Sequence, residues 1–235
     1  MAAGTKVDSA ADVVADLESE RTPEAMASVR KRLGPDEPVL GVRMGTLFAV
    51  AKRHTPLPLE EVESLLSHPA YEPRLAALCI LDFKARRRIA DDDRRALFDL
   101  YLGRHDRITT WDMVDRSAPR VVGGWLAGRS TAPLDDLAGS DDPLRRRTAI
   151  TAPLQFVAAG SDEDVTAGFA LADRLADDPD PVVHKAVGIF LKHAGTRDPE
   201  ALRRVLDDRA ASMARPAVRL AVEKLPAEER SRFVR

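Results

Sequence analysis

The sequence predicts an all-α fold, a solenoid in which pairs of helices stack along the chain. Only 5% of its 235 residues are aromatic, and Ala, Leu, Arg and Asp dominate, which favours helices because strands prefer β-branched and aromatic side chains. Proline and glycine recur at spacings that start and end short helices. A short motif also repeats along the chain, as is typical of proteins that bury the apolar face of each helical pair against the next.

Capping residues and prolines mark the helix starts. Asp8 or Ser9 can cap a first helix and Thr22-Pro23 can open a second, because a side-chain oxygen accepts a bond from a free first-turn N–H and proline fits the first helical position. Further helices are expected over residues 41–53, 58–67, 71–87, 91–104, 111–122, 133–139, 143–158, 162–176, 181–194, 199–207, 214–224 and 226–233. Breaks are expected at His68-Pro69, Gly123-Gly124, Asp142-Pro143, Gly160, Asp180-Pro181, Gly195 and Asp198-Pro199.

The repeating motif is a basic residue, any residue, and then a small one. It occurs at Arg43-Met-Gly45, Arg74-Leu-Ala76, Arg116-Ser-Ala118, Arg147-Thr-Ala149, His184-Lys-Ala186 and Arg219-Leu-Ala221. Successive copies are about 31 to 42 residues apart, which is typical of a HEAT-like α-solenoid. We therefore expect one HEAT-like domain over 1–235, C-shaped, with the repeated basic residues lining a concave groove.

A basic row of this kind has two interpretations. It can match the phosphates of a duplex, where counterion release drives binding, or its arginines can pair with Asp between neighbouring repeats. Asp115 directly precedes Arg116, and adjacent residues point roughly 100° apart on a helix, so either the repeat register slips at Arg116 or Arg116 points away from the groove.

Composition and residue patterns exclude several classes of function. The net charge of −2 excludes a protein that is basic all round, although local charge can still bind DNA. The five histidines show no metal-ligand spacing, and no phosphate or dinucleotide loop is present. Cys79, the single cysteine, lies in an apolar run and reads as a buried inert thiol. Neither a signal peptide at the N-terminus nor a membrane-spanning run is evident.

The segment 108–125 carries the chemistry. A helix that starts at Trp111, with Thr109 or Thr110 as its hydroxyl cap, puts Trp111 and Asp115 on one face because they are four residues apart. Asp112, in the first turn, is explained by the helix dipole. That explanation is weaker for Asp115, one turn further in, and an aromatic ring beside a carboxylate is a candidate site.

This segment resembles the DNA alkylation repair enzymes of the AlkD type, DNA glycosylases built from HEAT-like repeats. The resemblance rests on the W-D-x-V-D pattern that holds Trp111 and Asp115 and on the S-A-P that follows. It extends to Gly41-Val-Arg-Met-Gly45, Arg74-Leu-Ala-Ala-Leu-Cys-Ile-Leu-Asp82, Arg146-Arg-Thr-Ala-Ile150 and His184-Lys-Ala-Val-Gly188.

The resemblance implies hydrolysis of the N-glycosidic bond of cationic N3- or N7-alkylated purines in duplex DNA, as a step of base excision repair. Asp115 would stabilise positive charge on the sugar, and Trp111 would pack on the deoxyribose. It further implies cleavage without deep base flipping, tolerance of bulky adducts, and no cofactor or metal. Arg147 would hold a phosphate near the lesion. The residues expected to contact DNA are Arg43, Arg74, Arg116, Arg147, His184, Lys185, Ile189 and Arg219.

Two positions depart from the family pattern. Ile189 stands where relatives carry a second active-site tryptophan, and Phe190 cannot replace it because it points about 100° away. Val29 stands where relatives often have tyrosine. Either activity is weakened, or the groove is opened for a larger lesion.

The preferred interpretation is an active, monomeric, cytoplasmic glycosylase associated with the nucleoid. Its rival is a non-catalytic HEAT module that binds DNA or a protein partner, which the loss of tryptophan at Ile189 favours. A third possibility is a self-resistance enzyme that removes one bulky natural-product adduct.

Overall fold

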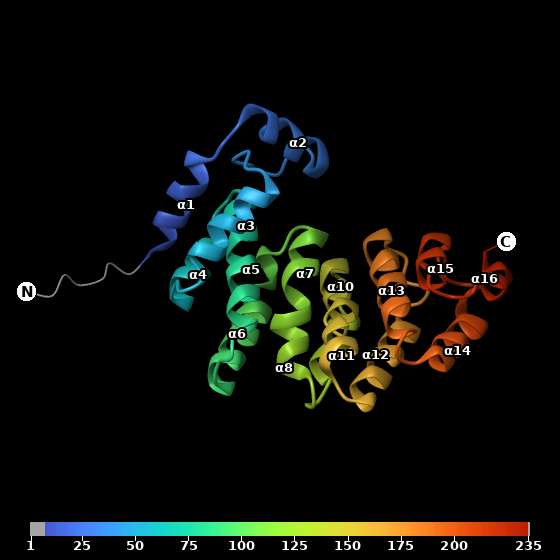
Figure 1. Cartoon of the computed structure of the whole chain (residues 1–235). Helices are drawn as coiled ribbons and strands as arrows, with labels where there is room; N and C mark the ends of the chain where they lie inside the picture. Colours follow the sequence, from blue (N-terminus) through green and yellow to red (C-terminus); the bar gives the residue numbers. More distant parts are fainter. Residues whose placement is uncertain (1–7, 235) are drawn as a thin grey trace, which may run out of the picture. The chain divides into compact units, whose positions relative to one another are not determined.

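The structure, a computed structural model, describes residues 8–234. Within that range every regular element is helical and no β-strand occurs (Figure 1). The chain divides into two compact units, Met1–Ile108 and Thr109–Arg235. The expectation of one domain over 1–235 therefore stays a prediction. The N-terminal residues considered for a signal peptide lie outside the described part.

Unit 1 is built from six α-helices and a short 3₁₀ turn. These are α1 (Ala10–Ser19), α2 (Pro23–Leu33), α3 (Met44–Arg53), α4 (Leu59–Leu66), α5 (Tyr71–Ala85), α6 (Asp91–Gly103) and η1 (His105–Arg107). Helix α5 is the centre of the unit: almost all of its residues are buried, and α3 and α4 pack against it while α1 packs on both. An apolar helix covered on several sides is what the unbroken hydrophobic run in its sequence predicts.

Unit 2 stacks its helices in chain order. Its elements are α7 (Trp111–Ala118), η2 (Pro119–Gly123), α8 (Gly124–Leu126), α9 (Ala132–Ala138), α10 (Pro143–Thr151), α11 (Leu154–Ala159), α12 (Asp162–Arg174), α13 (Pro181–Ala194), α14 (Pro199–Arg209), α15 (Arg215–Ala221) and α16 (Ala227–Phe233). Helix α7 packs on α10, α10 on α13, and α13 on α15 (Figure 1). Such nearest-neighbour packing is the arrangement expected of an α-solenoid.

The caps predicted for the first two helices are confirmed, since Ser9 and Thr22 each accept a first-turn backbone N–H. Ser9 forms a reciprocal capping box with Asp12 at the start of α1. The three Asp-Pro starts share one arrangement, in which the aspartate accepts a first-turn backbone N–H and proline takes the first helical position. They are Asp142-Pro143, Asp180-Pro181 and Asp198-Pro199.

Two predicted boundaries are wrong. The helix of α7 does not end at Gly123-Gly124: both glycines have helical angles, and the chain runs through a π-helical turn to Leu126. The glycine is needed for close packing, because a Cβ on Gly123 would lie 2.1 Å from the carbonyl oxygen of Ala152. The helix expected over 143–158 is instead two helices, α10 and α11, which part at Pro153.

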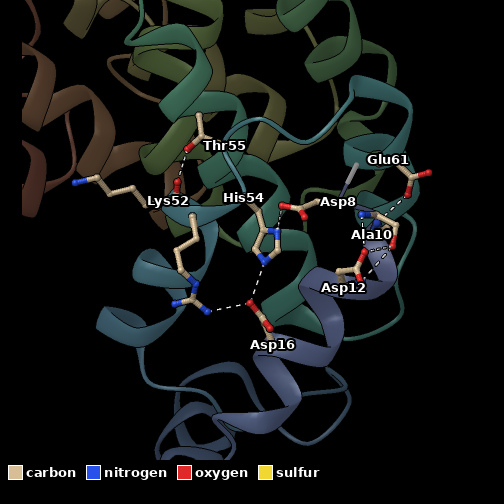
Figure 2. A network of polar contacts seen from close by, with 10 residues as sticks. Asp8, Ala10, Asp12, Asp16, Lys52, His54, Thr55 and Glu61 are labelled. Carbon is tan, nitrogen blue, oxygen red and sulfur yellow. Dashed lines mark hydrogen bonds and ion pairs between the residues drawn. The ribbon is translucent and has the colours of Figure 1, made fainter. Parts of the chain in front are cut away.

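A polar cluster fastens α1 to α3 and α4 in unit 1 (Figure 2). The buried His54 ring lies between two carboxylates, with Nδ1 2.9 Å from Asp8 and Nε2 3.0 Å from Asp16. Arg53 adds an ion pair to Asp16 at 2.9 Å. Glu61 accepts the backbone N–H of Ala10 at 2.8 Å.

No helix among residues 8–234 is long and apolar enough to cross a membrane.

Candidate active site

Trp111 and Asp115 lie on one face of α7, as predicted. Trp111 is 48% exposed, which is unusual for so large an apolar side chain, and the Asp115 side chain is 31% exposed. The helix begins at Trp111, but the predicted hydroxyl cap is absent. The Thr110 hydroxyl instead donates to Asp112 at 2.5 Å, and Asp112 accepts the backbone N–H of Met113 at 3.1 Å. Asp112 is thus bound by groups of its own turn, whereas the partly exposed Asp115 is bound by a residue of a neighbouring helix.

The turn after Asp115 is irregular for a physical reason. Pro119 has no N–H to donate to the carbonyl of Asp115, and residues from Pro119 to Gly123 form a π-helical turn. Turns of this type are often found at functional sites. Ser117, buried, donates its hydroxyl to the Met113 carbonyl at 2.7 Å and so holds the last turn of α7 in place.

Arg147, on α10, is the partner of Asp115. Its Nε and Nη2 donate to the two carboxylate oxygens at 2.8 and 2.6 Å, a bidentate geometry that fixes the plane of the carboxylate. Its remaining nitrogen, Nη1, donates to the backbone carbonyl of Val182 in the first turn of α13. The guanidinium carbon also lies 5.6 Å from the centre of the Trp111 ring. Three helices therefore meet at one buried arginine.

This arrangement leaves part of Asp115 available. A carboxylate has about four acceptor positions, and Arg147 takes two of them from the protein side. The Arg147 side chain is 3% exposed, in contrast to the more open Asp115. A ligand that reaches this face would meet the outer carboxylate edge and the indole of Trp111.

The other residues expected to bind DNA lie in different environments. Arg43 is exposed in unit 1, and Lys185 and Arg219 are exposed in unit 2; Arg116 and Ile189 are partly buried. His184 is partly buried, and its Nε2 lies against the Asp178 carbonyl. These placements leave Arg43, Lys185 and Arg219 able to meet a phosphate.

Arg74 and Arg147 differ from that expectation. Arg74 is buried in unit 1, forms an ion pair with Glu37, and also donates to the Arg107 carbonyl at 3.4 Å. Burial lowers its pKa, as does the charge of Arg107. Arg147 pairs with an aspartate of another helix, as the alternative interpretation expects, whereas Arg74 pairs with a glutamate, and neither arginine reaches a phosphate without breaking these bonds. Their DNA contacts stay a prediction.

The comparisons with known proteins identify the family of the chain. The family model of the DNA alkylation repair enzymes matches residues 13–225. The chain belongs to the DNA alkylation repair enzyme family. The structure is similar to a predicted DNA alkylation repair enzyme from Enterococcus faecalis, with a TM-score of 0.67, 15% identity, and 88% of this chain and 98% of that chain covered. That likeness shows the fold alone. A search of curated proteins found no match.

The two positions expected to depart from the family pattern, Ile189 and Val29, lie in different units. Ile189 lies on α13 two turns beyond Val182, and hence on the same face. Phe190 is fully buried and packs edge-on against Phe169 at 5.7 Å. Val29, in unit 1, lines a cavity of about 350 Å³ together with Arg43 and Tyr71.

Some residues at this site were not identified from the sequence. Val182 contributes only its backbone carbonyl, which no side-chain pattern reveals. Asp178 binds Arg146 through both carboxylate oxygens, at 2.6 and 3.1 Å. Its only signal in the sequence is its place two residues before the capping Asp180. Among residues 8–234, no group of three or more His, Cys, Asp or Glu side chains could hold a metal.

Proposed function

We propose that this protein is a DNA glycosylase, which hydrolyses the N-glycosidic bond of cationic N3- or N7-alkylated purines in duplex DNA without deep base flipping and needs no cofactor. The observation that carries the proposal is the pair of Asp115 and Trp111 on one open face of α7, with the carboxylate fixed by Arg147. Membership of the DNA alkylation repair family supports it.

The proposed reaction needs only what Asp115 can supply. The bond between C1′ and the purine nitrogen breaks, and its electron pair goes to the base, which leaves neutral because the alkylated base was cationic. Positive charge accumulates on the sugar, where the Asp115 carboxylate stabilises it electrostatically. Water then adds to C1′ and loses a proton. Because the leaving base is already activated, no strong general acid is required.

The two partners of Asp115 have distinct roles in this proposal. The Trp111 ring covers the sugar and attracts the cationic base through its face. Arg147 orients the carboxylate through its two hydrogen bonds and leaves the remaining acceptor positions of Asp115 to the ligand. DNA binding relies on exposed arginines and lysines, and the basic groove expected from the repeated motif belongs to the proposal.

The test is release of free base from a duplex that contains one N7-alkylguanine. We expect the wild-type protein to release base faster than the spontaneous rate, and Asp115→Asn to lose about 100-fold or more, because asparagine keeps the shape and removes the charge. Duplex binding should change little. Equal release by both proteins would remove Asp115 from its proposed role.

The rival function is a non-catalytic binding module. Ile189 favours it, because this residue stands where the family resemblance implies a second active-site tryptophan. It predicts no release by the wild type together with salt-sensitive duplex binding. A second duplex with a bulky N3- or N7-adduct separates this module from an enzyme specialised for larger lesions, since only the enzyme releases that base.

A further inference from the structure

Two adjacent arginines of α10, Arg146 and Arg147, both bind the chain around the start of α13, but at different residues. Arg147 donates to the carbonyl of Val182, in the first turn of α13. Arg146 points to the loop just before that helix, where it forms a bidentate pair with Asp178. Consecutive residues of α10 therefore hold two neighbouring points of the chain, Asp178 in the loop before α13 and Val182 in the first turn of α13.

Asp178 is enclosed by its partners. Its side chain is 3% exposed, against 14% for Arg146. One of its carboxylate oxygens also accepts the backbone N–H of Asp180 at 2.9 Å. Its own carbonyl lies against Nε2 of His184, which must therefore donate, because a carbonyl only accepts. Such burial prevents Asp178 from touching DNA.

The contacts form an unbroken path to the candidate active site. Asp178 fixes the backbone of Asp180, and Asp180 caps α13 by accepting the backbone N–H of Val182 at 2.8 Å. The carbonyl of the same Val182 receives Arg147, which holds both oxygens of Asp115. Every step is a direct hydrogen bond within unit 2. The position of the Asp115 carboxylate therefore depends on where the loop before α13 is held.

We propose that Asp178 is a positioning residue for Asp115, acting through the start of α13 and Arg147. This inference rests on the proposed function for its effect on the rate, but its effect on the geometry of the Trp111 face is independent of activity. Asp178 aligns the Val182 carbonyl so that Arg147 keeps its three acceptors at once. Without Asp178, Arg147 loses a fixed third acceptor and the carboxylate loses its fixed plane.

The pKa of Arg146 agrees with this assignment. It is raised above its ordinary value chiefly by the hydrogen bond to Asp178. Arg146 also donates to the carbonyls of Ser140 at 2.9 Å and Asp141 at 3.0 Å, so it is anchored to the loop before α10 as well. The ion pair of Arg146 and Asp178 therefore links the loop before α10 to the loop before α13.

The experiment compares Asp178→Asn with a matched variant, Asp173→Asn. Asp173 forms a similar bidentate pair with Arg209, at 2.7 and 3.0 Å, but this pair joins α12 to α14 and not to α10, which carries Arg147. Both variants are made in a Trp125→Phe background, so that Trp111 is the remaining tryptophan. The readouts are acrylamide quenching of Trp111 in the DNA-free protein and, separately, single-turnover base release and duplex Kd.

We expect Asp178→Asn to raise the quenching constant of Trp111 by about half or more and to slow base release at least 10-fold, with Kd changed less than 2-fold. Asp173→Asn should leave all three near the parent values. Asp178→Glu, which keeps the charge, should recover part of the rate. If the asparagine variant does not fold, Arg146→Lys provides the same test, because an ammonium cannot hold both oxygens of Asp178.

Two results would overturn the inference. One is a Trp111 quenching constant that does not distinguish the Asp178 and Asp173 variants. The other is equal loss of base release in both. If the parent protein releases base from neither the N7-alkylguanine duplex nor the bulky-adduct duplex, the glycosylase proposal fails, while the quenching comparison still decides whether Asp178 positions this site.

Discussion

Arg147 donates to three acceptor atoms while its side chain is 3% exposed. Lysine at this position offers one point charge and cannot hold both Asp115 oxygens together with the Val182 carbonyl. We predict that Arg147→Lys lowers the free energy of unfolding by about 2–3 kcal/mol, since a buried polar group loses its partners, and slows base release with little change in duplex binding. Urea unfolding measures the first effect. Arg145→Lys, in the same helix turn, is the control, and an equal loss there would contradict a special role for Arg147.

Asp16 gives a residue-scale prediction in acid. Its pKa is lowered below the ordinary value of 3.8, first by the hydrogen bond with His54 and then by Arg53. A lowered folded-state pKa means that ionised Asp16 stabilises the fold above pH 3.8 and that this contribution disappears as pH falls through the lowered pKa. The Asp16 side chain is 42% exposed, so solvent screening limits the effect to about 1 kcal/mol or less.

The corresponding measurement is the unfolding free energy of wild type and Asp16→Asn across this acid range. The difference between the two proteins should be largest above pH 3.8 and shrink below it. Asp99→Asn, whose carboxylate pairs with Arg95 at the surface, should show a smaller difference. If the difference in unfolding free energy between wild type and Asp16→Asn grew as the pH fell, the lowered pKa of Asp16 would be contradicted.

At the scale of elements, the π-helical turn between α7 and α8 requires a residue without a Cβ at position 123. Gly123 lies so close to α10's end that a Cβ would be 2.1 Å from the Ala152 oxygen, whereas Gly45 in α3 has nothing within 4 Å. We predict that Gly123→Ala lowers the free energy of unfolding by about 2–4 kcal/mol, because the added methyl group forces the helices apart. We predict that Gly45→Ala raises the free energy of unfolding by about 0.5–1 kcal/mol. Thermal unfolding of both variants tests this pair, and equal effects would contradict it.

The sequence could predict elements wherever local chemistry decides them. The Asp-Pro starts at Asp142, Asp180 and Asp198 were identified because a cap and a first-position proline act within one turn. Gly123 was misread as a break because its role is contact with a segment about thirty residues away. The split at Pro153 was missed for a related reason: whether an interior proline kinks a helix or ends it depends on packing.

At the scale of the whole molecule, a net charge of −2 requires that any DNA binding come from particular residues. Arg43, in unit 1, and Arg219, in unit 2, are exposed candidates. We predict that Arg43→Ala and Arg219→Ala each reduce the slope of log binding constant against log salt by about 0.9, for damaged and undamaged duplexes alike. Arg95→Ala, which removes an exposed arginine paired with Asp99, is the control. An unchanged slope would remove the tested arginine from the interface.

The candidate site itself was predictable only in part. Trp111 and Asp115 could be placed together because helical spacing and the family motif both act within one helix. Arg147 was singled out, but its burial and pairing with Asp115 follow from how α10 packs on α7, which spacing does not reveal. The path through Asp178 and the Val182 carbonyl depends on a loop and a backbone atom. Such long-range and backbone contacts leave no signature in a single sequence.

The most direct test of the central claim is a single-turnover comparison of two carboxylates on α7. Asp112 is bound by Thr110 and Met113 of its own turn. Asp115 is 31% exposed, lies on the same helix face as Trp111 and is bound by Arg147 of α10. With saturating protein and a duplex that contains one N7-alkylguanine, we predict that Asp115→Asn lowers the rate of base release by about 100-fold or more and that Asp112→Asn changes it by less than about 3-fold. Equal rates for the two variants would contradict the account.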